Sequence, residues 1–420
     1  MFERRHRALY AAFDRFPSRK GAAIHIDRFA RTLFGAFDGG ALFVLGEKHL
    51  PFHQRDGNVE IVRFVSDIEN FLERSMTFTA ALSKAVDELS PTLELAHFRD
   101  PWSGAAIALR PHDYACVYEV NALPSIELPV VFDAIAPRTL EKIRALELAC
   151  CDAADAIVTP SRTTAECLAS LGVDRAKVRV IPNGSDVDAP KPRPADAPEK
   201  YLLYFGAPQA WQGIDTLLRA FARLADFTDL RLVIIGSHES RSWRPYERLA
   251  EKLNLADRIV WRFAMDEPEL AAWRQHAYLT VAPLTDCPRN SVQGCAPLKI
   301  VESMGSGVAV VASDLAPVRE VIAHRENGWL VHPERPDELA RALRILLDYP
   351  ALARDLGQCA RETILNQFTW DAALEALRNL YEEWSADVSS AAVERLARQP
   401  MGDRARRPLA AAGDGRAPGK

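Results

Sequence analysis

The chain has 420 residues, of which 52 are Lys or Arg and 57 are Asp or Glu, so its formal net charge is -5. This nearly balanced charge argues against a dedicated nucleic-acid-binding protein, which would carry an excess of basic residues. Hydrophobic residues make up 48% of the chain, enough for two domain cores. Seven Cys without regular spacing predict buried thiols in a reducing compartment, not disulfides or a zinc site.

The N-terminal sequence and the apolar segments indicate a soluble protein, which we expect in the cytoplasm. The basic residues of segment 1–7 are followed by an apolar stretch that Asp14 and Arg15 interrupt, so a cleaved signal peptide is not expected. No apolar run approaches the roughly 18 residues that a membrane span needs. Four basic side chains suggest either a peripheral contact with anionic lipid at the inner face of the membrane or a solvated surface: Arg4, Arg5, Arg28 and Arg31.

In the first half of the chain, short apolar runs alternate with longer amphipathic segments, which is typical of a parallel α/β sheet. The predicted strands are residues 8–13, 41–45, 59–64, 93–97, 114–120, 155–159 and 177–182. The predicted helices are residues 22–35, 67–88, 136–152 and 161–171. We therefore expect a Rossmann-like domain over residues 1–188.

A proline-rich segment then separates the two halves. Four of the nine residues from 190 to 198 are Pro, which excludes both a helix and the interior of a sheet, so segment 186–198 is the predicted linker. Beyond it, strands are predicted near 201–206, 230–235, 257–261, 278–282, 308–312 and 328–331. Helices are predicted near 213–225, 244–254, 267–274, 297–305, 316–323 and 336–347.

This second set of strands and helices predicts another Rossmann-like domain over residues 199–365. The fold class is therefore α/β, with two doubly wound sheets that face each other across a cleft. The chain is expected to stay helical to Trp384, with residues 366–384 as a last helix. The stretch 385–420 is rich in Ala, Arg, Gly and Pro without apolar periodicity, and is predicted to be disordered.

The segment from Gly294 to Asp314 carries the strongest binding signal. Pro297 suits the first turn of a helix, so the backbone N–H groups around Leu298 and Lys299 would point outward and bind an anion such as phosphate. Glu302 lies one turn further along the same face, where its carboxylate would accept hydrogen bonds from a ribose. The alternative is an ordinary crossover helix with a solvated Glu.

A second candidate phosphate site is the strand, loop and helix from Tyr204 to Ile214. In this segment Gly206 and Gly213 let the backbone approach a ligand, and the second glycine precedes a helix N-terminus. The spacing is neither GxGxxG nor that of a phosphate-binding P-loop, which argues against a dinucleotide cofactor.

In the first domain, polar residues follow three predicted strands. Arg19 and Gly21 lie in the loop after the first strand, His97 and Arg99 end a later one, and Asn121 ends the next. Because the carboxyl ends of parallel strands meet at one edge, these residues should converge on the rim of the cleft. No residues have metal-ligand spacing and no GxSxG sequence occurs, so metal and serine-hydrolase chemistry are not expected.

Six motifs, in order, resemble the retaining glycosyltransferases of family 4, which have the GT-B fold. They are Phe16-Pro17 with Lys20-Gly21-Ala22, and segments 154–161, 181–186, 211–215, 296–304 and 368–370. The resemblance covers nearly the whole chain up to Trp384. It implies a nucleotide-sugar donor bound mainly by the C-terminal domain, a glycan, lipid-linked or small-molecule acceptor bound by the N-terminal domain, and transfer without a cofactor or an obligatory metal.

The same resemblance implies that Glu302 contacts the donor ribose, because it matches the second Glu of the family's Glu-(seven residues)-Glu motif. The first Glu of that motif is Gly294 here, and the Arg and Lys that usually hold the diphosphate are Ala207 and Gln212. The usual active-site His corresponds to Asn121, whose amide can form hydrogen bonds but cannot titrate.

The Ala-Pro-Leu-Lys sequence resembles a variant branch of the family, in which Lys299 and the helix N–H groups would neutralise the leaving diphosphate. The residues expected in catalysis are Lys299, Asn121 and His97. Donor binding is expected at Gly21, Gly206, Gly213, Pro297, Leu298, Lys299 and Glu302. Arg19, Arg99 and Arg289 are expected to contact the acceptor or a phosphate.

Three other functions remain open at this point. The first is an inactive, glycosyltransferase-like subunit that acts with a protein partner, since Ala207, Gln212 and Gly294 depart from the family pattern. The second is a GT-B epimerase of nucleotide sugars, which would need titratable groups beside the sugar. The third is a nicotinamide-dependent oxidoreductase, which would need the GxGxxG sequence that the chain lacks.

Overall fold

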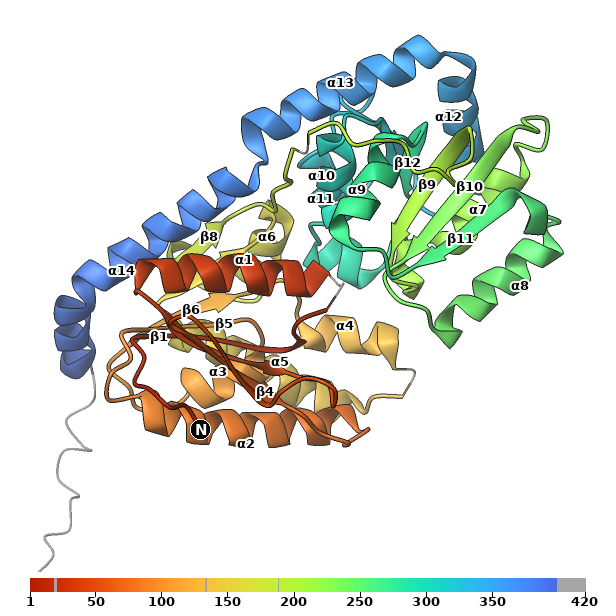
Figure 1. Cartoon of the computed structure of the whole chain (residues 1–420). Coiled ribbons are helices and arrows are strands. Elements are labelled where there is room, and N and C mark those ends of the chain that lie inside the picture. The colour runs from red at the N-terminus through yellow and green to blue at the C-terminus, as the bar shows by residue number, and fades with distance from the viewer. Residues whose placement is uncertain (19–20, 133, 188, 399–420) are drawn as a thin grey trace, which may run out of the picture.

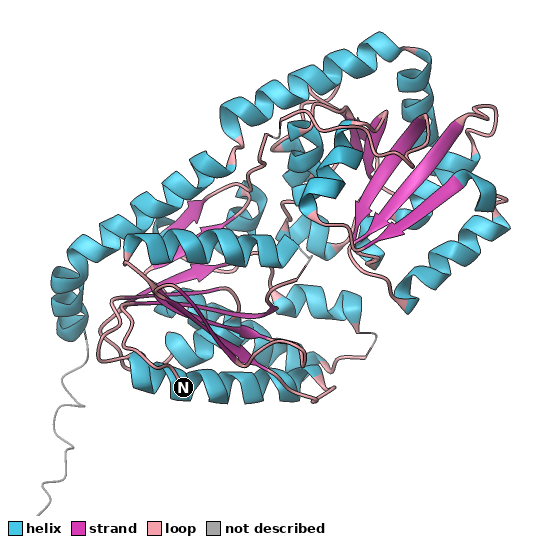
Figure 2. Ribbon diagram, viewed as in Figure 1, coloured by secondary structure: helices cyan, strands magenta, loops and turns pink. Residues whose placement is uncertain are grey.

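The computed structural model describes residues 1–18, 21–132, 134–187 and 189–398, with residues 385–398 given by their backbone alone. Figure 1 and Figure 2 show two groups of strands, each flanked by helices, with loops between the two groups. The predicted α/β class with two Rossmann-like domains is confirmed. Within the described residues, no helix is both long and apolar enough to cross a membrane.

The N-terminal domain contains an eight-stranded sheet in the order β3-β4-β2-β1-β5-β6-β7-β8, parallel except for the antiparallel pair β3–β4. Its strands are β1 (Ala8–Arg15), β2 (Gly40–Leu45), β3 (His53–Asp56), β4 (Val59–Phe64), β5 (Leu95–Phe98), β6 (Ala115–Glu119), β7 (Ala156–Thr159) and β8 (Val178–Val180). Its helices are α1 (Gly21–Ala36), α2 (Phe71–Leu89), α3 (Pro101–Ile107), α4 (Pro124–Val131), α5 (Pro137–Ala153) and α6 (Arg162–Ser170).

Both faces of the central part of this sheet are buried, which is why its inner strands are mostly apolar, whereas the edge strand β3 is mostly exposed. In β1, Leu9 and Ala11 join the apolar cluster under α2, α3 and α5, while Tyr10 and Ala12 join the cluster under α1. Successive side chains of this strand point to opposite faces of the sheet and thus belong to two different apolar clusters. The carboxyl ends of the strands remain free to carry polar loops.

The C-terminal domain contains a six-stranded parallel sheet in the order β11-β10-β9-β12-β13-β14. Its strands are β9 (Lys200–Gly206), β10 (Leu230–Gly236), β11 (Ile259–Phe263), β12 (Leu279–Ala282), β13 (Val310–Ser313) and β14 (Trp329–Val331). The helices are α7 (Ile214–Ala222), α8 (Arg244–Lys252), α9 (Glu267–Gln275), α10 (Leu298–Gly305), α11 (Ala316–Arg319), α12 (Pro336–Asp348) and α13 (Pro350–Gln367).

The last helix, α14 (Trp370–Arg398), returns to the N-terminal domain, where Figure 1 shows it beside α1. Its residues Trp370, Leu377 and Tyr381 belong to the same apolar cluster as β1 and α1. The predicted disorder from residue 385 is wrong as far as Arg398, because the sequence there consists mostly of good helix formers. The rest of that prediction, residues 399–420, lies outside the described residues.

The two chain segments that connect the domains lie side by side. The N–H of Ser185, in the first connection, donates to the carbonyl of Phe368, in the second, over 2.9 Å. A Cβ on Gly184 would lie 2.3 Å from the backbone nitrogen of Trp370, so only glycine allows the two segments to approach this closely.

Candidate functional site

Two helix N-termini, one from each domain, meet at the cleft. Helix α1 begins at Gly21 and helix α10 begins at Leu298, with Pro297 immediately before it. A Cβ on Gly21 would lie 3.1 Å from Cδ1 of Leu298, so the two first turns are in contact. The first N–H groups of a helix have no partner within the helix and carry partial positive charge, so two such ends favour an anion between the domains.

Lys299, in the first turn of α10, is held against the loop that follows β9. Its ammonium donates a hydrogen bond to Oε1 of Gln212 and lies 4.2 Å from the centre of the Tyr204 ring. Gly206 has a φ of +138°, and a Cβ there would lie 3.0 Å from Nζ of Lys299. Gly213 is needed because a Cβ would lie 1.8 Å from the carbonyl oxygen of Pro283. The structure therefore brings together Lys299 and both predicted glycines.

Glu302 lies one turn further along α10 and faces the cleft. Its side chain is 14% exposed, and Oε2 is 3.9 Å from Nη1 of Arg274, whose Nη2 also contacts Glu267 over 2.6 Å. The cleft beside it has a volume of about 470 Å³. It is lined from the N-terminal domain by Phe16, Pro17, Ser18, Ala23, Ile24, Asp27, Arg28 and Arg31, and by Trp370 of the returning helix.

Burial moves both charged groups of α10 toward neutrality. It lowers the pKa of Lys299 to about 7, although the Glu302 carboxylate partly opposes this change. It raises the pKa of Glu302 to about 7, although Arg274 partly opposes that change. Neither group has enough opposite charge around it to keep its ordinary pKa. A ligand that brings a phosphate to the ammonium and hydroxyl groups to the carboxylate would supply what is missing.

The corresponding cluster of the N-terminal domain is centred on Glu119, at the end of β6. Its buried carboxylate accepts a hydrogen bond from the hydroxyl of Tyr10 over 2.6 Å and one from Nε of Arg99 over 3.0 Å. Nδ1 of His25 and Nε2 of His97 each lie 3.3 Å from it. Burial alone would raise the pKa of Glu119, but Arg99 and the hydrogen bonds outweigh it and hold that pKa well below its usual range.

His97 is therefore not placed to contact a substrate. It is fully buried, and its Nδ1 is 2.8 Å from the hydroxyl of Tyr381 on α14. The expectation that His97 is catalytic is wrong, because both ring nitrogens are engaged inside the domain. Arg99 is also mostly buried, but its Nη1 reaches Oδ2 of the more exposed Asp14, near the carboxyl end of β1, over 2.6 Å. Asn121 is half-buried and donates a hydrogen bond to Glu119.

Arg289 is held by a carboxylate of the other domain and by an aromatic ring. Its Nε donates to Oε1 of Glu127 over 2.6 Å, and its guanidinium lies 4.6 Å from the centre of the Trp211 ring. Because Glu127 is on α4, this pair links the two domains. Arg19, the other predicted helper, lies outside the described residues. Sequence analysis missed Arg274, which also lines the cleft. In the sequence it has the pattern of an ordinary basic residue near the end of a helix.

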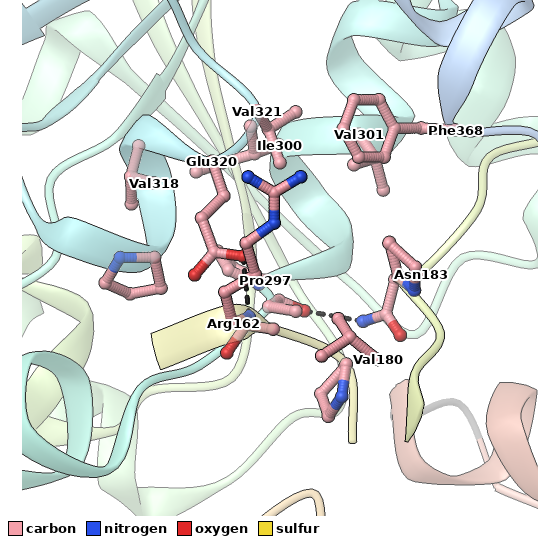
Figure 3. Close-up of a pocket in the computed structure, with 15 residues that line it drawn as sticks. Arg162, Val180, Asn183, Pro297, Ile300, Val301, Val318, Glu320, Val321 and Phe368 are labelled. Atoms are coloured by element: carbon pink, nitrogen blue, oxygen red, sulfur yellow. Dashed lines mark hydrogen bonds between the residues drawn. The ribbon is translucent and has the colours of Figure 1, made fainter. Parts of the chain in front are cut away.

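Gly294 lies where the two domains are in contact, at a position that favours glycine. Gly294 has a φ of +85°, and a Cβ there would lie 3.0 Å from the side chain of Thr163 in the other domain. Figure 3 shows the neighbouring pocket, where the carboxylate of Glu320 accepts hydrogen bonds from the backbone N–H groups of Arg162 and Thr163, each over 2.8 Å. Asn183 closes the other side by donating to the carbonyl of Ala296 over 2.6 Å.

Comparisons with known proteins match this arrangement. The family model "Glycosyltransferase Family 4" matches residues 19–189, and the model "Glycosyl transferases group 1" matches residues 188–363. The chain is 28% identical over 235 residues to an MMP alpha-(1->4)-mannosyltransferase of Mycolicibacterium hassiacum, covering 56% of this chain and 55% of the relative. It is 29% identical over 263 residues to a D-inositol 3-phosphate glycosyltransferase of Acidothermus cellulolyticus, covering 58% and 57%.

The chain thus spans only about half the length of these relatives. Among solved structures, sucrose-phosphate synthase from Thermosynechococcus elongatus matches with a TM-score of 0.74 and 21% identity, over 91% of this chain and 100% of that one. Anabaena HepE in complex with UDP-glucose matches with a TM-score of 0.70 and 16% identity, over 90% and 100%. With two adjoining family models that together cover residues 19–363, the chain belongs to the group 1 glycosyltransferases of family 4 and has the GT-B fold.

Proposed function

We propose that the chain transfers a sugar from a nucleotide-sugar donor to a hydroxyl group of a glycan, a lipid-linked or a small-molecule acceptor, with retention of the anomeric configuration. The observation that carries this proposal is the pairing of Lys299 and Glu302 on α10, each held by burial at a pKa of about 7. The mannosyltransferase and glycosyltransferase names of the relatives support the same class of activity.

In this proposal the donor diphosphate lies between the N-termini of α1 and α10. Lys299 supplies the positive charge and the first-turn N–H groups supply hydrogen bonds. Glu302 accepts hydrogen bonds from the ribose, which is the neutral, hydrogen-donating partner that its carboxylate needs. These contacts provide the neutralisation that a metal ion would otherwise give, so we propose that no metal is obligatory.

The proposed reaction needs no protein base. The bond between the anomeric carbon and the diphosphate oxygen breaks while the acceptor oxygen bonds to the same face of that carbon. The acceptor proton passes to the departing diphosphate oxygen, whose charge Lys299 stabilises. Positioning and charge stabilisation together lower the barrier by several kcal/mol in such reactions. Asn121 and the Arg99–Asp14 pair line the rim of the N-terminal domain and are the proposed contacts for acceptor hydroxyls.

The departures from the family pattern do not favour an inactive subunit. Gln212 accepts a hydrogen bond from Lys299, whereas a Lys at this position would place two cations together. Gly294 has a positive φ and lies against Thr163 of the other domain, where a side chain would be strained. These two departures thus have structural roles beside an intact pair of charged groups, as expected for a different but functional donor site.

The test is calorimetric titration of the purified protein with UDP-, GDP-, ADP- and dTDP-sugars in the presence of a chelator. We expect one nucleotide to bind, and Lys299→Ala and Glu302→Ala to weaken that binding. Lys252→Ala is the matched control, because Lys252 is exposed at the end of α8 in the same domain. Failure of the folded protein to bind any donor would contradict the proposal and favour the partner-subunit function.

A second measurement concerns the chemistry itself. With the donor identified, product formation on an acceptor library is followed by NMR of the anomeric proton. Retention of the donor configuration is the expected result, and inversion would overturn the proposed front-face reaction. Conversion of the donor into its epimer without transfer would instead identify a nucleotide-sugar epimerase.

A further inference from the structure

A cluster of imidazole and carboxylate groups lies on the N-terminal domain, away from the cleft. His53 comes from β3, Glu60 from β4, and Glu3 and His6 from the segment that precedes β1. Strand β4 runs parallel to β2, and Glu60 is near its amino end. The cluster therefore lies toward the edge of the sheet opposite to the carboxyl ends, which face the cleft.

The distances within this cluster suit a shared metal ion. One ligand atom from each of Glu3, His53 and Glu60 lies within 4.8 Å of the others. Oε2 of Glu60 is 3.7 Å from Nε2 of His53 and 3.4 Å from Nε2 of His6. Two ligands bound to one tetrahedral zinc ion, each at about 2.0 Å, lie about 3.3 Å apart. The distances from Glu60 to the two imidazoles are thus within a few tenths of an ångström of metal-binding separations, whereas the exposed Glu3 carboxylate, 4.0 Å from Nδ1 of His53, would have to move closer.

Three polar atoms of the cluster are buried without the hydrogen bonds that such atoms need. Glu60 is 1% exposed and His6 is 7% exposed. Among the described residues, nothing forms a hydrogen bond with Nε2 of His6, Nε2 of His53 or Oε1 of Glu60. Buried polar atoms are almost always paired, so unsatisfied atoms on three neighbouring side chains indicate a missing partner. A cation satisfies two imidazole lone pairs and a carboxylate at the same time.

The segment that carries two of these residues is fixed in place. The terminal ammonium of Met1 lies 2.7 Å from Glu88, and the N–H of Glu3 donates to Oε2 of Glu60 over 2.8 Å. The carbonyl of His6 accepts a hydrogen bond from Thr92 over 3.0 Å. The N-terminal segment is thus already held across the edge of the sheet, so an ion would bind without having to order it first.

We propose that Glu3, His53 and Glu60, with His6 as the fourth ligand, bind one divalent transition-metal ion. Mixed nitrogen and oxygen ligands favour zinc over magnesium or calcium, which prefer oxygen alone. The ion would join the N-terminal segment to the β3–β4 hairpin at the end of the sheet. Sequence spacing predicts no metal site because the four ligands come from segments far apart in the chain.

The test uses the 420-residue chain without a polyhistidine tag, after treatment with a chelator. Titration with zinc, followed by metal analysis of the desalted protein, should give one ion per chain and a higher unfolding temperature. His53→Gln and Glu3→Gln should each weaken zinc binding at least tenfold. His49→Gln is the matched control, because His49 is an exposed imidazole in the loop before β3.

Two results would overturn the proposal. One is zinc binding by His53→Gln as tight as by the His49→Gln control. The other is an unfolding temperature that zinc does not change in the unaltered chain but that His53→Gln lowers, because the histidine and Glu60 would then form a simple ion pair. A misfolded His53→Gln variant would also lose zinc. Glu3→Gln tests for this, because the Glu3 side chain is 66% exposed and its replacement should not disturb folding. Cobalt gives an independent readout, through the visible absorption of the four-coordinate ion.

Discussion

The charged clusters on the two sides of the cleft differ in how completely their charges are paired. In the N-terminal domain, Glu119 is surrounded by Arg99, two imidazoles and hydrogen-bond donors, and its pKa lies well below the usual range. In the C-terminal domain, the nearest cation to Glu302 among the described residues is 3.9 Å away and is shared with Glu267, and the pKa of Glu302 is about 7. A buried charge with a full set of partners stabilises the fold, whereas one with few partners is typical of a site that binds a ligand.

The largest expected effect is that of Glu119→Gln on stability. Removing one partner from a buried charge network leaves the other charges uncompensated and costs about 3–5 kcal/mol. Thermal and urea unfolding measure this change. The matched control is Glu94→Gln, which breaks an exposed pair with Arg7 and should cost about 1 kcal/mol or less. Equal effects of the two substitutions would contradict a structural role for the Glu119 cluster.

Next in size is the effect of Lys299→Ala on nucleotide binding. Loss of a charge-assisted contact with phosphate, about 1.5–3 kcal/mol, should weaken the affinity for a nucleoside diphosphate by about 10- to 100-fold. Without ligand, the variant should be at least as stable as the unaltered chain, because the buried ammonium has no full counter-charge. Titration calorimetry and thermal unfolding measure the two quantities. A large loss of stability without ligand would mean that Lys299 serves the fold.

The pH dependence of binding sharpens this prediction. The pKa of Lys299 is about 7 in the free protein, and a bound diphosphate must raise it. Affinity should therefore fall as pH rises above about 7, and binding there should take up a proton, which calorimetry in buffers of different ionisation enthalpy detects. Lys299→Arg keeps its charge at these pH values, so its affinity should not fall in the same range. A parallel decline in Lys299→Arg would assign the titration to another group.

A smaller gain in stability is expected from Glu302→Gln. A carboxyl group whose pKa rises from 4.5 in the unfolded chain to about 7 in the folded one costs stability on ionisation. The cost is absent below about pH 4.5, grows between the two values and is complete above about pH 7. Near pH 8 the variant should be up to about 3 kcal/mol more stable and near pH 4 no different, while ligand binding becomes weaker. Unfolding curves at the two pH values distinguish this from a change in packing.

The smallest effect is expected from Tyr381→Phe. It removes the hydrogen bond to His97 and should cost about 1 kcal/mol of stability. Donor affinity and the pH profile of transfer should not change, because His97 does not reach the cleft. A shift of that profile in Tyr381→Phe would restore a catalytic role for the imidazole.

Most of the fold could be predicted because the apolar periodicity of each strand and helix is local. The elements that sequence analysis missed are short. Helix α3 has a signal of its own, since Asp100 accepts a hydrogen bond from the N–H of Ser103 and Pro101 occupies the first turn. That signal was hidden by the strand that ends immediately before it. Strand β3 has little apolar pattern because it is an exposed edge strand.

The candidate site also contains residues that the sequence predicts and residues that it does not. The residues of the C-terminal side were predictable because a single segment, Pro297 to Glu302, carries the helix N-terminus and both charges. His97 was misjudged because Tyr381, which buries it, lies 284 positions away in the sequence. Arg274 was missed for a related reason, since only tertiary packing brings α9 against α10.

The return of α14 also determines when the N-terminal domain can be completed during synthesis. Trp370, Leu377 and Tyr381 are buried in the same apolar cluster as β1 and α1, which are made before the whole C-terminal domain. Until residues 370–381 have been made, that cluster remains uncovered on one side. The C-terminal domain has its own core and needs no later residues for it, so the half that is translated second is the first to have all of its parts.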